Sequence, residues 1–550
     1  MTTIESSPEA AAVTSRDADS GRFLAAVAEW LTSTDHKRIG RLYLAGGLLG
    51  LLIAVVISAL LAIERLDSKG FVLDVDALPQ VFDAQRIALV FGALLPLAMA
   101  MCVAFVPLQL GARAIAFPRL ATTGLWMWFG GLVLNGFSLI NDGGTLGLDS
   151  DMVDLFIVSM GLMAIGLTAT AGSVATSILT TRAPGMTMRR IPPFAWSALV
   201  FSIGIVLVMP VFVGTLTYLF LDHRNARTGF GGNIGIFDWA GWIVTQPATF
   251  LFAIPAIGVL AEVLPVTFKK RMPARGVMFA GLALIGVSAL FAVTQQNLQT
   301  LPWSGSQLSG DDIEQKVRDL VPYSMFNLLP ILGMVLIMII GLAIARPQRG
   351  MRVNVTGGFV FSFFGFGIIL IGMLGTVLYA IDDLDLQGTV FEEAALVCIV
   401  YGAALSVMGA VTYWAPKLWG QIISTKAIVP LAFFGAAGAV LAGLPYFIAG
   451  FLGQEAGPIY TGDDLLIWNI LSLVGHVLFA LVVVVFIAVI LMSTMSRRAG
   501  PGDDPWDAQT LEWVTTSPAP RDNFTEVPVV HSPEPLLDLK QNATAEGSRA

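Results

Sequence analysis

The chain has 550 residues, of which 55% are hydrophobic and only 13% are charged, with a formal net charge of −8. Soluble globular proteins carry about 25% charged residues, so this composition excludes the soluble classes and predicts an integral membrane protein. The acidic balance offers no basic surface to a nucleic acid, and we expect no nucleic-acid partner.

Residues 1–30 are expected to form a disordered cytoplasmic segment. The first 20 residues are small and polar, and they lack the apolar core of a signal peptide. The first apolar span would therefore direct its own insertion into the membrane.

Apolar stretches of about 20 residues, the length that spans a bilayer, recur from residue 41 onward. Only helices satisfy their own backbone at this apolar density, so the sequence predicts an all-α polytopic membrane bundle. We expect about twelve spans. They lie near 41–63, 87–109, 120–140, 152–180, 194–221, 237–264, 276–298, 324–345, 354–381, 390–415, 427–452 and 464–494.

Basic and acidic loops alternate along the chain. The loops near residues 37–41 and 269–275 are basic, whereas those near 142–149 and 311–314 are acidic. The positive-inside rule then places both termini in the cytoplasm of a bacterial cell, with the chain in the plasma membrane. This orientation requires an even number of spans.

The last segment, 499–550, is rich in proline and acidic residues and poor in apolar ones. It predicts an extended cytoplasmic tail that lies over the cytoplasmic face. The sequence thus divides into the lead 1–30, a membrane domain 31–498 and this tail.

Only four histidines occur in the chain: His36, His223, His476 and His531. His476 lies in the last span, where it could be a metal ligand or a proton relay. A lone histidine without a partner at ligand spacing favours a hydrogen-bonded core residue. Glu392 and Glu393 open the tenth span, either as an ion entrance or because the helix dipole favours acidic residues there.

Six segments, in order, resemble subunit I of cytochrome c oxidase, a member of the haem-copper oxidase family. They are TSTDHKRIGRLYL (32–44), GARAIAFPRL (111–120), RAPGMTMRRIPPFAWS (182–197), TYWAPKLWG (412–420), IWNILSLVGH (467–476) and DPWDAQTLEWVTTSPAP (504–520). The resemblance implies a twelve-helix subunit of an oxygen-reducing, proton-pumping respiratory enzyme. It also implies two haems and a copper ion held by six histidines.

The same register places residues other than histidine at every ligand position that the resemblance implies. The haem-ligand positions hold Gln85, Ala394 and Leu396, and the copper-ligand positions hold Gln246, Gln295 and Gln296. The proton-delivering glutamate and the cross-linked tyrosine of the family correspond to Ala248 and Phe250. We therefore expect no haem and no copper cofactor.

Three hypotheses about function follow. The first is a non-catalytic pseudoenzyme, a structural or regulatory subunit of a bacterial respiratory complex that contacts lipid and subunit II-like or III-like proteins. The second is a channel or carrier that uses a polar cavity lined by Gln85, Gln246, Gln295 and Gln296. The third is a working terminal oxidase subunit with unconventional ligation.

Two absent macrocycles would leave large voids, which protein interiors do not tolerate. We expect Phe250, Leu396 and the phenylalanines of the ninth span to fill this space. These phenylalanines are Phe359, Phe361, Phe363, Phe364 and Phe366.

Overall fold

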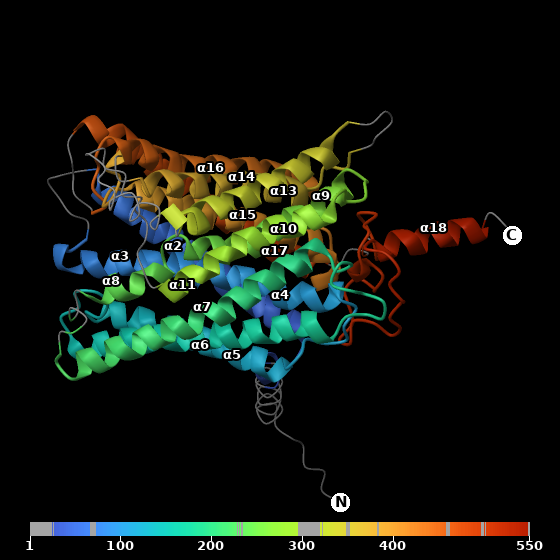
Figure 1. Ribbon diagram of the computed structural model, residues 1–550, viewed down its shortest axis with the longest axis horizontal. Coiled ribbons are helices and arrows are strands. Elements are labelled where there is room, and N and C mark those ends of the chain that lie inside the picture. The colour runs from blue at the N-terminus through green and yellow to red at the C-terminus, as the bar shows by residue number, and fades with distance from the viewer. Residues whose placement is uncertain are drawn as a thin grey trace, which may run out of the picture.

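The computed structural model of the chain is a helical bundle whose long helices run side by side (Figure 1). It describes residues 25, 27–66, 73–227, 229, 232, 235–294, 320, 321, 323–347, 353–381, 384–457, 463–496, 500 and 502–547. Apart from one isolated bridge between Thr389 and Glu455, the regular structure of these residues is helical. The expected all-α membrane fold is confirmed.

Eleven helices of the described residues are long and apolar enough to cross a membrane. Several consist of consecutive segments, because π-helical or 3-10 turns interrupt them. In chain order the spans are α2 His36–Glu64; α3 Leu78–Ile87, η2 Ala88–Leu94 and α4 Leu95–Gln109; α5 Pro118–Ile140; α6 Ser150–Thr180; α7 Pro193–Arg224; the run Asp238–Thr267, which contains α9 Ala248–Thr267; η5 Ser324–Leu328 and α13 Leu329–Ala345; α14 Gly357–Tyr379; α15 Phe391–Trp419; α16 Thr425–Phe451; and α17 Leu466–Met495.

The difference from the expected twelve spans lies at the seventh, predicted at 276–298. There the structure has the shorter helix α10 Arg275–Gly286, the 3-10 turn η4 Val287–Leu290 and α11 Phe291–Thr294. The remainder of that predicted span lies outside the described residues. The prediction of an even span count, and with it the cytoplasmic placement of both termini, stays a prediction.

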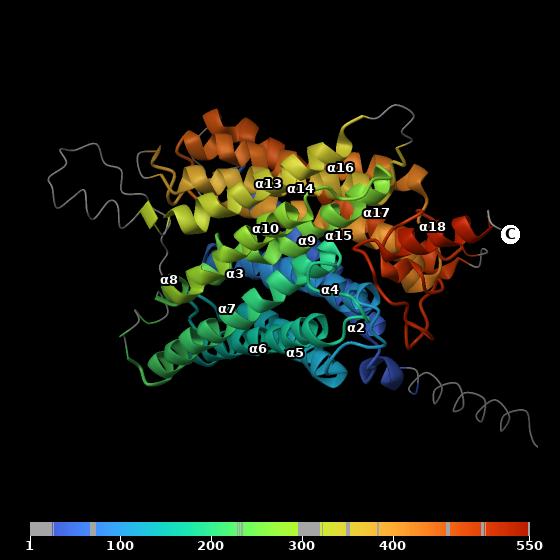
Figure 2. The ribbon, with the colours of Figure 1, turned by 45° about the vertical axis from the view of Figure 1, so that its right-hand side comes forward.

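Three spans form the centre of the bundle. The most apolar windows of Leu78–Gln109, Asp238–Thr267 and Phe391–Trp419 are entirely buried, whereas those of the other spans are about one-third to three-fifths buried. Helices that are apolar all round belong inside a bundle. In Figure 2, α4, α9 and α15 run between the group α13, α14 and α16 and the group α5, α6 and α7. Most of the ligand positions that the resemblance implies lie on these central spans.

The contact between α2 and the second span is very close. A Cβ atom added to Gly50 would lie 2.1 Å from the carbonyl oxygen of Gly92, inside the π-helical turn η2. A side chain at residue 50 therefore requires the two backbones to move apart.

We expect Gly50→Ala to destabilise the bundle by about 1–3 kcal/mol, as overpacking of a filled core does. Gly172→Ala is the matched control, because residue 172 of α6 has nothing within 4 Å of an added Cβ. Alanine there should be neutral or slightly stabilising. Thermal unfolding of the purified proteins in detergent measures both, and equal melting temperatures for the two variants would contradict the close contact.

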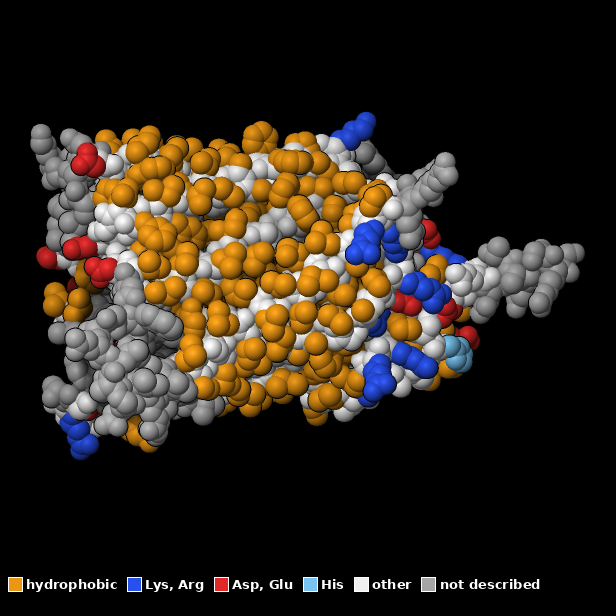
Figure 3. Space-filling model, turned by 45° about the horizontal axis from the view of Figure 1, so that its top comes forward, with side chains coloured by type: hydrophobic (Ala, Val, Ile, Leu, Met, Phe, Trp, Pro, Cys, Tyr) orange, Lys and Arg blue, Asp and Glu red, His pale blue; other side chains and the backbone are white. Residues whose placement is uncertain are grey.

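Charged residues lie at the two ends of the bundle, and an apolar surface separates them (Figure 3). Lysine and arginine gather mostly at the end that carries the C-terminal tail, and acidic residues gather at the opposite end. We call these the basic end and the acidic end.

The segment after α17 folds against the basic end. Trp506 Nε1 donates to the Tyr413 carbonyl at 2.8 Å, and Asn523 hydrogen-bonds with both His36 and Lys37 at the start of α2. Glu512, in the turn η8 Leu511–Trp513, is fully buried. The segment ends in α18 Pro535–Gly547. The lead 1–30 falls mostly outside the described residues, and the division into three parts stays a prediction.

Candidate functional site

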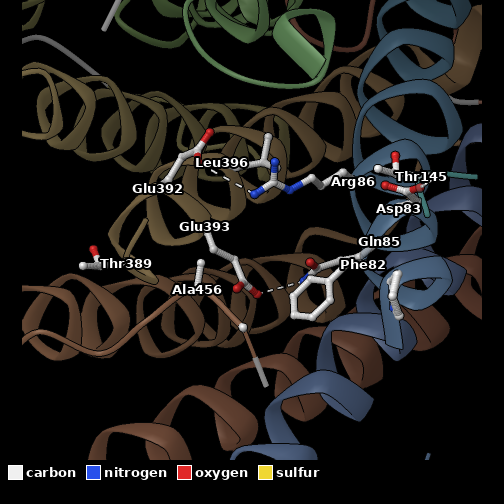
Figure 4. Close-up of a pocket in the computed structure, with 12 residues that line it drawn as sticks. Phe82, Asp83, Gln85, Arg86, Thr145, Thr389, Glu392, Glu393, Leu396 and Ala456 are labelled. Carbon is white, nitrogen blue, oxygen red and sulfur yellow. Dashed lines mark hydrogen bonds and ion pairs between the residues drawn. The ribbon is translucent and has the colours of Figure 1, made fainter. Parts of the chain in front are cut away.

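Gln85 connects the second and tenth spans. Its side chain is 2% exposed, and its Nε2 donates to Ser58 Oγ of α2 at 3.0 Å and to Glu393 Oε1 of α15 at 2.9 Å (Figure 4). The two partners of Gln85 are thus a serine of the first span and a glutamate of the tenth.

Glu393 also forms a buried ion pair. Arg65, directly after α2, donates from Nη2 to Glu393 Oε2 at 2.6 Å and to the Ala456 carbonyl at 2.9 Å. The Arg65 side chain is fully buried, and its guanidinium lies 4.9 Å from the centre of the Tyr446 ring. A charge-assisted bond of this kind is stronger than a neutral one, and each ion compensates the burial of the other. We call this pair the Arg65–Glu393 bridge.

His476 is a hydrogen-bonded core residue. Its Nδ1 and the Tyr401 hydroxyl form a 2.8 Å hydrogen bond, and both side chains are fully buried. The Tyr401 ring stacks on Phe479 with centroids 4.0 Å apart. His476 is therefore hydrogen-bonded within the core through Nδ1, as the sequence favoured.

The copper-ligand positions are only partly described. Gln246, Ala248 and Phe250 are all buried at the start of α9. Gln295 and Gln296 lie outside the described residues. A polar cavity lined by all four glutamines therefore stays a prediction.

The phenylalanines of the ninth span point in several directions. Phe361 and Phe366 of α14 are buried, but the Phe363 side chain is 53% exposed on the outer surface. Phe364 packs edge-on against Phe433 of α16. The expectation that all five fill an interior space is wrong for Phe363, because helical geometry turns successive residues to different faces.

A cavity of about 290 Å³ remains beside Gln85 at the acidic end. Its lining includes Gln85, Glu393 and Leu396, together with Asp83 and Arg86 of the second span. Leu396 thus lines a space instead of closing it (Figure 4). Ala394, the other predicted haem-ligand position on α15, is fully buried.

Sequence reasoning missed Arg65 as a site residue. It stands in a polar break after α2, where an exposed loop residue is the ordinary expectation. One sequence signal could have suggested the bridge. An acidic pair, Glu392 and Glu393, begins the tenth span, and a basic residue, Arg65, follows the first.

Comparison with known proteins identifies the family of the chain. Residues 38–478 match the family Cytochrome C and Quinol oxidase polypeptide I. The chain is 29% identical to cytochrome c oxidase subunit 1 of Bacillus subtilis over 93% of its own length and 83% of that protein. It is 28% identical to the cytochrome bo(3) ubiquinol oxidase subunit 1 of Buchnera aphidicola, over 93% of its own length and 79% of that protein.

The fold and these similarities define the class as a multi-pass respiratory membrane protein. The chain belongs to the cytochrome c and quinol oxidase subunit I family. Its relatives include bacterial enzymes that act on cytochrome c and on ubiquinol, so membership alone does not choose an electron donor.

Proposed function

We propose that this chain is a non-catalytic member of its family, a structural or regulatory subunit of a bacterial respiratory membrane complex. The observation that carries the proposal is the hydrogen bond between Gln85 and Glu393. It joins the second and tenth spans, the two helices that, by the family register, would hold one haem iron between them.

The residues at these positions do not fit a haem. Iron in this family is held by imidazole, whose nitrogen has a lone pair directed at the metal. The Gln85 nitrogen instead donates both of its protons, to Ser58 and Glu393, and Ala394 and Leu396 have no ligand atom. A haem would require this pair to separate and leave the Glu393 carboxylate without one of its partners.

The described residues at the copper positions do not fit copper either. Copper prefers imidazole, thiolate or thioether ligands, and a neutral amide such as that of Gln246 is a weak donor. Three of the four histidines have other roles: His36 bonds to Val103 and Asn523, His223 to Asp154, and His476 to Tyr401.

Purified protein should show no Soret band, no pyridine haemochrome and no stoichiometric copper, because imidazole ligands are missing. A catalytic member of the family, purified from membranes in the same way, is the control. About one haem per chain would overturn the proposal and favour a working oxidase with unconventional ligation.

The structural role predicts stable association with other membrane subunits. We expect an affinity-tagged chain, extracted in mild detergent, to retain subunit II-like or III-like proteins in fixed ratio. Recovery of the chain alone, together with growth that depends on a solute, would favour a carrier. The cavity beside Gln85 is the observation that supports a carrier as the second candidate function.

A further inference from the structure

The cavity at the acidic end is lined by more acidic than basic side chains. Three carboxylates, those of Asp83, Glu392 and Glu393, line it, and among the lining residues Arg86 is the one cationic side chain. Arg86 lies 3.7 Å from Glu392. Since Glu393 already pairs with Arg65, the acidic charge left over near the opening belongs to Asp83.

Asp83 and Gln85 line this cavity with carboxylate and amide oxygens that can accept hydrogen bonds from a ligand. Asp83 is 8% exposed, and its Oδ2 accepts a hydrogen bond from the Thr145 backbone at 2.7 Å. Gln85 is 2% exposed and donates from Nε2 to Ser58 and Glu393, and its Oε1 accepts no hydrogen bond from the residues that the structure describes. An N–H donor placed in the cavity would bond to these oxygens, and a bond to the Asp83 carboxylate would be charge-assisted.

The remaining walls are apolar. Pro79, Phe82 and Leu396 line the same space, and the labelled charged groups approach it from α3 and α15 (Figure 4). Pockets of this kind, apolar with a few directed polar groups, are typical of small-molecule sites. A volume of about 290 Å³ suits a ligand of only a few heavy atoms.

A metal ion fits this site less well. Among the described residues, no three acidic, imidazole or thiolate side chains gather closely enough to hold one. The carboxylates therefore lie too far apart to hold one metal ion together. They can instead accept hydrogen bonds from several N–H donors of one ligand group.

We propose that this cavity binds a small organic cation, a primary ammonium or guanidinium group on a short apolar body, that enters from the acidic end. The N–H donors reach Asp83 and Gln85 Oε1, and the apolar part lies against Phe82 and Leu396. The site is independent of whether the chain assembles with other subunits.

The probe is n-butylammonium, titrated into the full-length protein in detergent and followed by calorimetry and thermal shift. We expect saturable binding and a raised melting temperature, because a ligand that binds only the folded state stabilises it. The neutral 1-butanol and the anionic butyrate have the same apolar body, and neither should bind detectably.

Two variants test the site from different sides. Asp83→Asn keeps the acceptor for Thr145 and removes the charge, and should weaken n-butylammonium binding at least about tenfold. Leu396→Trp keeps every charge and fills the cavity, and should abolish binding. Asp385→Asn is the control, since Asp385 is exposed and is not part of the cavity lining.

Three results would overturn the proposal. Equal binding of 1-butanol would make this an apolar pocket without cation selectivity. An equal thermal shift from sodium chloride would make it an inorganic cation site. Unchanged binding in both Asp83→Asn and Leu396→Trp would place the probe elsewhere on the protein.

Discussion

Replacing Arg65 by methionine should destabilise the folded protein by about 3–5 kcal/mol. The change leaves the Glu393 carboxylate buried with Gln85 as its remaining partner, and an uncompensated buried charge costs about that much. Thermal unfolding in detergent, read by loss of monodisperse protein, measures the effect.

The double variant Arg65→Met, Glu393→Leu should recover most of that loss, because apolar side chains can replace a buried ion pair at little cost. A double-mutant cycle over the two residues isolates the energy of the pair. Arg38→Met is the control, since Arg38 pairs with the exposed Glu29 and surface pairs contribute little. If the double variant is no more stable than Arg65→Met, the two groups do not act as a pair.

The bundle itself could be predicted because its causes are local. A run of apolar residues long enough to cross a bilayer must be helical, whatever its neighbours are. The buried positions of Gln85, Ala394 and Leu396 also followed from position in a span. The length of the seventh helix could not be predicted in this way, because the periodicity of its apolar residues does not reveal the 3-10 turn at Val287–Leu290.

The site could be predicted only in part because its partners are distant in sequence. Arg65 and Glu393 are separated by 328 positions, and Tyr401 and His476 by 75. Glu393 stood at a helix start, where the dipole alone accounts for an acidic residue. The periodicity of a single sequence does not identify which loop residue will form an ion pair with Glu393.

The C-terminal segment was underestimated for a related reason. It has few apolar residues, yet Trp513 is buried and lies beneath the Lys417 ammonium, 5.0 Å from the ring centre. Lys417 also donates to the backbone carbonyls of Asp503 and Thr515. The segment is held by polar groups at the helix ends, which composition does not reveal.

The attachment of this C-terminal segment to the bundle should depend on pH. Glu512 is fully buried, and it accepts hydrogen bonds from Gln109 at 3.3 Å and Trp414 at 3.2 Å. Burial raises the pKa of Glu512 above its ordinary value of 4.5, and the hydrogen bonds only partly oppose this. The carboxyl of Glu262, itself buried in α9, interacts electrostatically with Glu512.

A carboxyl group with a raised pKa binds its proton more tightly when folded than when unfolded. Its contribution is therefore fully present below the unfolded pKa, and it is lost as the pH rises through the higher folded pKa. We expect the segment that contains Trp506 and Trp513 to detach progressively as the pH rises above the ordinary carboxyl pKa of 4.5 and through the higher pKa of folded Glu512. Hydrogen exchange of these backbone amides in detergent, or limited proteolysis, follows the detachment.

Glu512→Gln should make the attachment independent of pH, because the amide keeps an acceptor oxygen for Gln109 and Trp414 and carries no charge. Glu526→Gln is the matched control, since Glu526 is exposed on the same segment and should retain the pH dependence of the parent. The same loss of protection with pH in Glu512→Gln and in the parent would show that another group controls attachment. A segment released only in the parent and in Glu526→Gln would instead identify the proton on Glu512 as the group that holds it to the bundle.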